Sequence, residues 1–326
     1  MLQIAIIFLS LFILEVLYFK VADYFNIIDK PSERGSSKFI TLRGGGIIFY
    51  IGALIWFIFY GREYWLFFTG LSIVSILSFV DDIHSLSARL RLPLQFIGML
   101  LLLSQLILGN NSIIDINSSG FFTIVLILVL GLVICTGAMN VFNFMDGING
   151  ITGGYSLIVL SAILFILDKE TLLGQSSEVE TIVSLLKIVL SAALVFCFFN
   201  FRSRAKCFAG DVGSVSIAFI ILFTLGFIVI NTGDLSWLSF LVVYGVDGCL
   251  TILHRIMLHE NISQPHRKHL FQIMANELKV PHVIVSLVYM AVQLLCCIWY
   301  VSRLSYTFMP DYNIIYYIYT IYAQIL

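Results

Sequence analysis

Residues 214–231, SVSIAFIILFTLGFIVIN, form an unbroken apolar run directly after the polar segment GDVG at 210–213. A run of this length suits a helix that crosses the roughly 30 Å hydrocarbon core of a membrane. Similar runs lie on both sides of it, at 2–21, 45–60, 64–80, 92–109, 121–141, 151–168, 182–200, 235–253 and 282–302. A tyrosine-rich stretch at 312–326 is either an eleventh span or an interfacial helix. The sequence therefore predicts an all-α polytopic membrane protein with ten or eleven transmembrane helices.

The composition fits this class of protein. Of 326 residues, 60% are hydrophobic and 11% are charged, whereas a soluble domain is about half apolar and a quarter charged. The formal net charge of −1 provides no basic surface for a nucleic-acid backbone, so nucleic-acid binding is disfavoured. The cysteines lie mostly in apolar runs, which favours buried hydrophobic roles over disulfides or zinc. The run at 2–21 is too long for a signal peptide, and one membrane domain over 1–326 is expected.

Basic residues divide the connecting loops into two sets. Thirteen Lys and Arg lie in one set, while the other holds three, Arg62, Lys169 and Arg303. The positive-inside rule places the first set in the cytoplasm and the N-terminus outside. That set consists of the loops at 22–44, 81–91, 142–150, 201–213 and 254–281. Because the same loops hold nearly all the Asp, His and glycine-rich clusters, the active site is expected at the cytoplasmic face.

The first cytoplasmic loop carries Lys38 and Arg43, followed by glycines at 44–46. Glycine N–H groups can approach a phosphate closely, and the two cations add positive charge. Basic loops and glycines are also common where a span begins, so a phosphate site and an ordinary loop remain equal alternatives.

Asp81 and Asp82 stand at the cytoplasmic end of the span at 64–80. Adjacent carboxylates at a lipid boundary need a cation, a proton or a basic partner. Because their side chains diverge by about 100° on a helix, one can face a metal or substrate while the other meets Arg89 or Arg91. A functional role is favoured over a solvated helix end.

Residues 140–150, NVFNFMDGING, place Asn140, Asn143, Asp146 and Asn149 at intervals of three. On a helix the first two share a face, and the Asp-Gly and Asn-Gly pairs then break into a tight turn. A helix end followed by a turn explains part of this pattern. The whole ladder favours a binding loop.

Asp211 lies between two glycines where a span begins. Its carboxylate can cap the helix that follows, or bind a hard cation such as magnesium through oxygen. Because Asp81, Asp82 and Asn143 are expected on the same face of the membrane, the metal is favoured.

The last cytoplasmic loop is rich in histidine and basic residues. His266 and His269 enclose two cations, an arrangement suited to gripping a pyrophosphate or giving it a proton. A zinc site is the alternative, but no nearby cysteine or suitably spaced acid completes four ligands. Asp247, in the apolar run before Arg255, is an acid that needs a function or a partner.

These motifs, in this order and on one side, resemble those of the polyprenyl-phosphate N-acetylhexosamine-1-phosphate transferases, which include the related phospho-MurNAc-pentapeptide transferases. The similarity runs from about residue 29 to 272. Any one motif is weak, but the ordered set is specific. The motifs are RGGGI at 43–47, DD at 81–82, NFMDGINGI at 143–151, GDVGS at 210–214, Asp247 with HR at 254–255, and HRKHL at 266–270.

The resemblance implies a magnesium-dependent enzyme, with manganese as a substitute ion. A UDP-N-acetylamino sugar would give its sugar 1-phosphate to undecaprenyl phosphate and release UMP, the first membrane step of a surface polysaccharide such as O-antigen or capsule. The expected place is the bacterial inner membrane, with the bilayer and both substrates as partners and a homodimer as an open alternative. The sugar stays open among UDP-GlcNAc, UDP-GalNAc, UDP-QuiNAc and UDP-FucNAc.

The resemblance also implies roles for individual residues. Asp211 matches the magnesium ligand with Asn143 as a second ligand, and Asp81 matches the acid that deprotonates or orients the lipid phosphate, supported by Asp82. Phe208 matches an aromatic near uracil. The catalytic group is Asp81, Asp82, His266 and His269, and the substrate-binding group is Lys38, Arg43, Asn140, Asp146, Asn149, Phe208, Asp247, Arg255 and Arg267.

Two departures from the family pattern stand out. Position 149 is Asn where many relatives have Asp, and RSRAKCFAGD at 202–211 replaces a proline-containing segment. Two other functions fit the sequence less well. A transporter would place polar residues in broken spans and show inverted repeats, and no repeat is found. An inactive scaffold would be expected to lose an acid at 81, 82 or 211, and all three are present.

Overall fold

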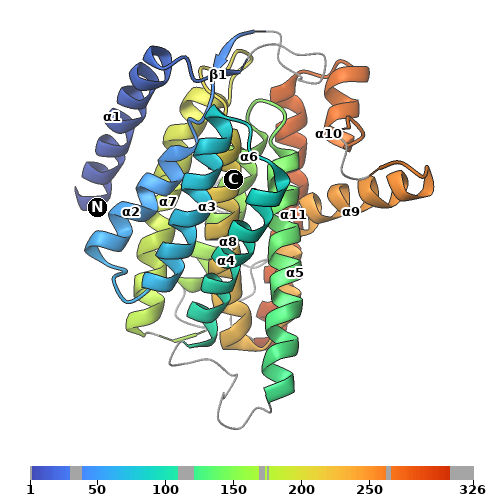
Figure 1. Ribbon diagram of the computed structural model, residues 1–326. Helices are drawn as coiled ribbons and strands as arrows, with labels where there is room; N and C mark the ends of the chain where they lie inside the picture. The colour runs from blue at the N-terminus through green and yellow to red at the C-terminus, as the bar shows by residue number, and fades with distance from the viewer. Residues whose placement is uncertain are drawn as a thin grey trace, which may run out of the picture.

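The computed structural model describes residues 2–29, 39–108, 121–168, 173–174, 176–261 and 266–308. Two expectations, the binding role of Lys38 and the span at 312–326, lie outside these residues. The described chain is almost entirely helical (Figure 1). Its helices are α1 (Leu2–Tyr24), α2 (Ile47–Phe59), α3 (Trp65–Ile83), α4 (Ala88–Ile107), α5 (Phe121–Met145), α6 (Ile151–Leu167), α7 (Ser177–Asn200), α8 (Gly210–Thr232), the 3-10 helix η1 (Leu235–Leu241), α9 (Val242–Met257), α10 (Leu270–Gln272), the π-helix η2 (Ile273–Glu277) and α11 (His282–Phe308).

Eight of the described helical segments are long and apolar enough to cross a membrane, with η1 and α9 counted together. Two shorter apolar helices, α2 and α6, bring the set to ten. The expectation of an all-α polytopic membrane protein is confirmed. A short antiparallel ribbon of β1 (Ile28–Asp29) and β2 (Thr41–Leu42) joins α1 to α2.

Helix α8 lies at the centre of the bundle. Seventeen of its 23 residues are buried, and it packs against α2, α3, α4, α5 and α6. The rings of Phe67 and Phe223 stack at 3.9 Å, and Ser75 and Ser216 share a hydrogen bond of 2.8 Å. In lipid, close packing and interhelical hydrogen bonds of this kind hold helices together. The first turn of α8 is thereby fixed relative to α3 and α5.

The loop before α2 touches the first turn of α8 backbone to backbone. A Cβ atom on Gly213 would lie 2.6 Å from the Cα atom of Gly46, closer than real side chains approach. Glycine at both positions permits this contact. The loop that carries Arg43 is therefore held against the start of α8.

The span expected at 235–253 is divided into η1 and α9, and α9 projects sideways from the bundle (Figure 1). The Tyr155 hydroxyl on α6 lies 3.2 Å from the Phe240 carbonyl and 3.0 Å from Gln293 Oε1, and its one hydrogen is shared between these two acceptors. The same Gln293 oxygen accepts the Val243 N–H at 3.3 Å. Since a membrane interior offers no water to unpaired backbone groups, these two side chains are what allow the break.

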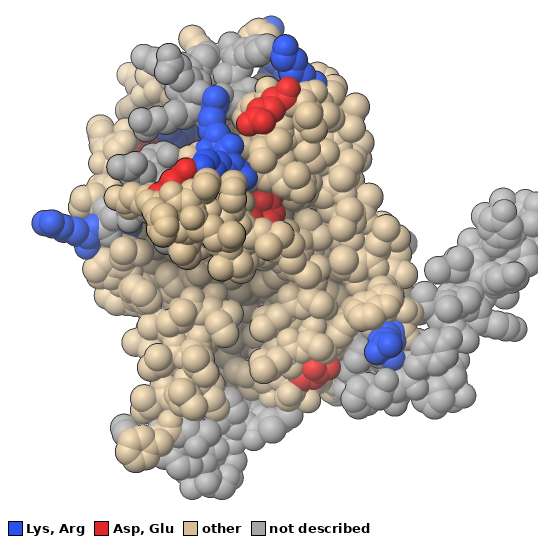
Figure 2. Space-filling model, turned by 90° about the vertical axis from the view of Figure 1, so that its right-hand side faces the viewer, with Lys and Arg blue, Asp and Glu red and all other residues tan. Residues whose placement is uncertain are grey.

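The polar loops gather at one end of the bundle, shown at the top of Figure 1. The Phe208 N–H donates to the Leu42 carbonyl at 2.8 Å, and the Gly150 N–H donates to Asn200 Oδ1 at 2.7 Å. Figure 2 shows charged side chains concentrated at this end of the visible face, above a broad band with hardly any charge. The expected meeting of these loops on one side is confirmed, and the side of the membrane stays a prediction.

Candidate active site

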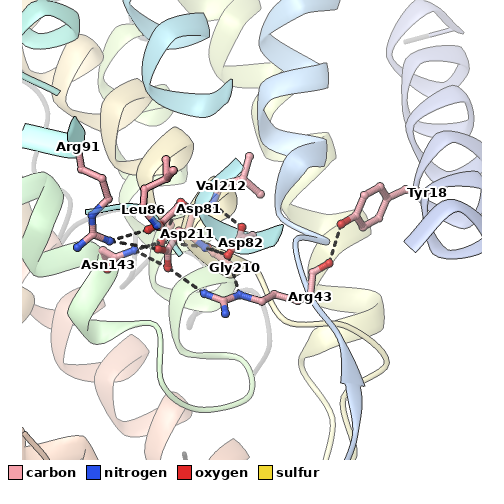
Figure 3. Close-up of polar contacts among 11 residues, drawn as sticks. Tyr18, Arg43, Asp81, Asp82, Leu86, Arg91, Asn143, Gly210, Asp211 and Val212 are labelled. Carbon is pink, nitrogen blue, oxygen red and sulfur yellow. Dashed lines mark hydrogen bonds and ion pairs between the residues drawn. The ribbon is translucent and has the colours of Figure 1, made fainter. Parts of the chain in front are cut away.

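Carboxylates and guanidinium groups meet where α3 ends and α8 begins (Figure 3). Arg43 donates through Nε to Asp82 Oδ1 at 2.6 Å and through Nη2 to Asp211 Oδ1 at 3.4 Å. Arg91 donates to Asp81 Oδ2 at 2.6 Å, and its Nη1 lies 3.7 Å from Asp211 Oδ2. The three carboxylates outnumber the two guanidinium groups by one charge, so the charge of the cluster can be balanced by a further cation. The expected pairing of one acid with Arg89 or Arg91 is confirmed for Arg91.

Asp81 and Asp82 turn to different partners, as expected for neighbours on a helix. Asp82 accepts the backbone N–H groups of Asp211 and Val212 at 2.8 and 3.0 Å, so it caps the N-terminus of α8. Its side chain is 0% exposed. Asp82 thus has the geometry of a residue that positions Asp211, whereas Asp81 accepts the Leu86 N–H at 2.5 Å and faces Arg91.

Asp211 is the member of the cluster that reaches open space. Its side chain is 23% exposed and lines a cavity of about 270 Å³. Asn143 Nδ2 lies 3.1 Å from Asp211 Oδ1 and 3.1 Å from Ser214 Oγ. Turning the amide by 180° puts its oxygen at the same place. Asp211 and Asn143 therefore offer two hard oxygen donors beside the cavity.

This donor pair fits a magnesium ion. Among the described residues, no group of three or more His, Cys, Asp and Glu side chains is arranged to hold a metal. Magnesium is commonly bound by one or two carboxylates, with substrate phosphates and water as the other ligands. An ion between Asp211 and Asn143 would thus be completed by substrate rather than by more protein.

The glycines after Arg43 serve packing. The Gly45 and Gly46 N–H groups donate to the carbonyls of Phe208 and Ala209 at 2.9 and 3.1 Å. Because these N–H groups are already bonded, the ordinary-loop alternative fits both glycines better than the phosphate site. Arg43 keeps its role in the site. Burial would lower its pKa, but the charges of Asp82 and Asp211 outweigh burial and raise it.

Asp146 lines the same cavity and accepts a hydrogen bond from Thr152 Oγ1 at 2.7 Å. Burial raises the pKa of Asp146 to about 7; the Thr152 bond and Arg43 oppose this shift, and the charges of Asp211 and Asp82 add to it. Near neutral pH the carboxyl group is therefore partly protonated and able to donate a hydrogen bond. That suits a contact with a carbonyl oxygen of a ligand.

Asn149 is buried and lines this cavity and a second one of about 240 Å³. Its Nδ2 donates to the carbonyls of Arg202 and Ser203 at 2.9 and 3.3 Å. An aspartate cannot donate to either, which explains why an amide fits here. Phe208 also lines both cavities, as expected of a base-stacking residue.

Asn140 is not among the residues that line the cavity beside Asp211. Its amide donates to the Thr136 carbonyl at 2.8 Å, one turn back on α5. The expected helical face of Asn140 and Asn143 therefore places only Asn143 at the cavity. Asn140 stays a prediction as a substrate-binding residue.

Arg255 holds the loop that leads to the histidines. It is 3% exposed, lies 3.3 Å from Glu260 and donates to the Asn261 carbonyl at 2.5 Å. Lys268 pairs with the same Glu260 carboxylate. The geometry gives Arg255 a supporting place at the base of this loop, while Arg267 is exposed on it.

The two histidines of this loop differ. His269 is buried, with Nδ1 at 3.3 Å from Asp247 Oδ1, and its ring centroid is 4.9 Å from that of His266. His266 accepts the Lys268 N–H at 3.4 Å. Burial and the charges of His269 and Arg255 lower the pKa of His266 to about 4. His266 is therefore neutral at pH 7 and supplies no positive charge to a phosphate.

An apolar groove of about 540 Å³ lies between α9, η2 and α11. Its lining includes Val242, Val246 and Val292, with His254 in the second half of α9 and Lys268 on the histidine loop. The groove is therefore mostly apolar, with positively charged and titratable groups in its lining. The motif residues Asp247, His254 and Lys268 line this groove, but no motif indicates its apolar walls, because the other lining residues are mostly ordinary members of apolar runs.

The cavity beside Asp211 also includes residues that the motifs did not indicate: Asp29, Gln272 and His282. Burial raises the pKa of Asp29, and Arg43 opposes that shift. Asp29 lies in the ribbon before the basic loop, and His282 begins α11. Gln272 lies just after the HRKHL motif, whereas Asp29 and His282 lie more than ten residues from any motif and carry no signal in the sequence.

The sequence of the chain matches a known family. The sequence model of glycosyl transferase family 4 matches residues 64–231. The probable undecaprenyl-phosphate N-acetylglucosaminyl 1-phosphate transferase of Bacillus subtilis (strain 168) is 25% identical over 270 residues, covering 80% of this chain and 73% of the relative. The undecaprenyl-phosphate alpha-N-acetylglucosaminyl 1-phosphate transferase of Escherichia coli (strain K12) is 28% identical over 235 residues, covering 67% and 60%.

A phospho-N-acetylmuramoyl-pentapeptide-transferase of Dictyoglomus thermophilum is 29% identical over 234 residues, covering 67% of this chain and 64% of the relative. The chain thus spans less than two thirds of the Escherichia coli and Dictyoglomus relatives. The family match covers more than half of the chain and includes all three carboxylates that meet at the start of α8. On the extent of this match, the chain belongs to glycosyl transferase family 4.

Proposed function

We propose that this protein transfers an N-acetylamino sugar 1-phosphate from a UDP-sugar to undecaprenyl phosphate and releases UMP. The observation that carries the proposal is the pair Asp211 and Asn143, which lines a 270 Å³ cavity, with the guanidinium groups of Arg43 and Arg91 beside Asp211. Phosphoryl transfer depends on this kind of site, where positive charge surrounds the phosphates and the partners are held in line. The names of the relatives support the same reaction class.

In the proposed reaction, an oxygen of the lipid phosphate attacks the phosphorus that bears the sugar. A new P–O bond forms there, the P–O bond to the UMP phosphate breaks, and the electron pair leaves with UMP. Arg43 and Arg91 stabilise negative charge on the phosphate oxygens. To Asp81, which faces Arg91, we assign the role of accepting a hydrogen bond from a protonated lipid phosphate or orienting it.

The donor is assigned to the two cavities that share lining residues. Phe208 and Asn149 line both of them, and Asp146 adds a hydrogen-bonding carboxyl group in the first. An aromatic ring beside donors and acceptors suits a uracil base. Magnesium, with manganese as a substitute, would be held by Asp211 and Asn143 and would neutralise the diphosphate charge.

The acceptor is assigned to the 540 Å³ groove between α9 and α11. Valine side chains suit an isoprenoid chain, and Lys268 and His254 suit its phosphate. We place the enzyme in the bacterial inner membrane, N-terminus outside and site on the cytoplasmic face. UDP-GlcNAc or a related sugar is the proposed donor, at the first membrane step of surface polysaccharide synthesis such as O-antigen or capsule.

The test is UMP release and labelled lipid product in detergent, from a panel of UDP-N-acetyl sugars with undecaprenyl phosphate, with and without EDTA. One sugar should give product, and EDTA should stop it. Asp211→Asn should abolish turnover, because a neutral amide is a poorer ligand for a hard cation.

The matched control is Asp168→Asn, which changes an exposed acid paired with Lys187 at 3.1 Å. Turnover should stay within about twofold of wild type, as for surface changes in general. Normal activity in Asp211→Asn would remove the metal assignment, and no product from any sugar in folded protein would remove the proposed reaction.

A further inference from the structure

Asp247, Tyr289 and His269 form a buried line of polar contacts apart from the carboxylate cluster. The Tyr289 hydroxyl donates to Asp247 Oδ2 at 2.6 Å, and Asp247 Oδ1 lies 3.3 Å from His269 Nδ1. The side chains of Asp247 and His269 are 5% and 3% exposed. The three come from α9, α11 and the residue that begins α10, so the bundle itself holds the line together.

The contacts of Asp247 place a proton on His269 Nδ1. Asp247 Oδ1 also accepts the Leu270 N–H at 3.0 Å and the Thr251 hydroxyl at 3.3 Å. A carboxylate that accepts several hydrogen bonds is not itself a donor, so the imidazole donates in this contact. The Gln272 N–H is directed both at the His269 side chain, in a capping box, and at the His269 carbonyl at 3.0 Å, and the adjacent Asp247 carboxylate favours the hydrogen on Nδ1 over this contact with the side chain.

The other imidazole nitrogen is the unsatisfied one. His269 Nε2 is buried and has no hydrogen-bond partner among the described residues. A buried polar atom of this kind is costly unless something else fills its bond. Phe144, whose ring is close to that of His269, and Gln272, on the short helix after His269, line the 270 Å³ cavity. Asp247 and Lys268 line the 540 Å³ groove. His269 therefore lies between the two spaces assigned to the substrates.

We propose that Asp247 and Tyr289 are positioning residues that hold the His269 imidazole by Nδ1–H, so that Nε2–H is presented to a phosphate oxygen of the substrates. This inference rests on the proposed function. His266 cannot take this part, because burial and its neighbouring charges lower its pKa to about 4.

Other charged and titratable groups surround His269, and their charges also act on its imidazole. On the described residues, α5 brings the uncharged ring of Phe144. The groups that carry or gain charge are Asp247, His254 and Arg255 on α9, Glu260, His266, Arg267 and Lys268 on the loop, and Tyr289 with His282 on α11. Of these, Asp247 is the acid that contacts the imidazole.

The direct test is the pKa of His269, measured in the full-length protein in detergent by deuterium exchange of histidine C2 hydrogens and mass spectrometry. Asp247→Asn should lower that pKa by about one unit or more, because an anion next to the imidazolium is lost. Tyr289→Phe should raise it, because Asp247 loses its shortest donor and acts more strongly on the imidazole.

Tyr300→Phe is the matched control. Tyr300 lies on the same helix and donates to another acid, Asp234 Oδ2, at 3.0 Å, away from the site. It should leave the His269 pKa unchanged. Because Asp247→Asn and Tyr289→Phe are expected to act in opposite directions, general damage to the fold does not imitate the result. If Asp247→Asn fails to fold, the sign of the Tyr289→Phe shift decides.

The kinetic readout is the pH dependence of kcat. The limb at which activity falls with rising pH should move to lower pH in Asp247→Asn and to higher pH in Tyr289→Phe, with kcat changed more than KM. An unchanged His269 pKa in Asp247→Asn, or an equal shift in Tyr300→Phe, overturns the positioning role even if turnover is normal. Shifts in the expected directions without any wild-type turnover leave the line of contacts intact and overturn the proposed function.

Discussion

Arg43 joins two acids with different nitrogens of one guanidinium group. Its Nε contacts Asp82 at 2.6 Å and its Nη2 contacts Asp211 at 3.4 Å. A lysine has one nitrogen and cannot bridge both. Arg43→Lys should therefore lower turnover by about tenfold or more while the protein still folds. Steady-state UMP release measures this. Arg62→Lys, an exposed arginine that contacts the Ile58 carbonyl, is the control and should match wild type.

The Nδ2 atom of Asn149 explains why an amide rather than a carboxylate fits at this position. Its Nδ2 donates to two backbone carbonyls. Asn149→Asp would remove both hydrogen bonds and face a carboxylate toward two oxygens, costing about 2–4 kcal/mol of folding free energy. Asn149→Ala removes the bonds without the repulsion and should cost less. Thermal unfolding midpoints in detergent compare them; equal midpoints would show that repulsion contributes nothing.

At the scale of elements, the break between η1 and α9 depends on other helices. Tyr155 and Gln293 satisfy the carbonyl and N–H that the break exposes. The break lets α9 leave the bundle and carry Asp247 toward His269. A helix interruption inside a membrane is thus a product of its neighbours rather than of its own sequence.

The pair that supports this break should behave as one unit. Gln293→Leu leaves the Val243 N–H and the Tyr155 hydroxyl with fewer partners and should cost about 1–3 kcal/mol of stability. Tyr155→Phe should cost a similar amount. Because both share one hydrogen bond, the double variant should lose less than the sum. Unfolding midpoints of the four proteins give the coupling, and simple additivity would mean that the two side chains act separately.

The same break marks the limit of prediction from sequence. Apolar run length located the ten helices, and helix geometry anticipated that Asp81 and Asp82 would diverge. The span at 235–253 was expected to be continuous, because the residues that stabilise its break are distant in the chain. The start of α8 at Gly210 rather than 214 has the same cause, since its cap, Asp82, is on α3.

At the scale of the whole molecule, the free energy of unfolding depends on pH through the acids at the end of the bundle where the polar loops gather. The pKa of Asp146, raised by burial to about 7, lies above that of an unfolded aspartate, so the folded state binds more protons between these values. Stability should therefore fall as pH rises from about 4 to 7. In EDTA, the wild-type unfolding midpoint should drop over this range more than that of Asp146→Asn. Equal slopes would contradict the raised pKa.

The backbone contact between Gly46 and Gly213 limits which residues can stand at these two positions. Neither position has room for a methyl group, so a library of all substitutions should recover almost nothing there. Gly137 on α5 and Gly245 on α9 have no atom within 4 Å of an added Cβ. Alanine at these two should be accepted and add about 0.5–1 kcal/mol of helix stability each. Gly46 and Gly213 must therefore both remain glycine, whereas Gly137 and Gly245 can be replaced by alanine.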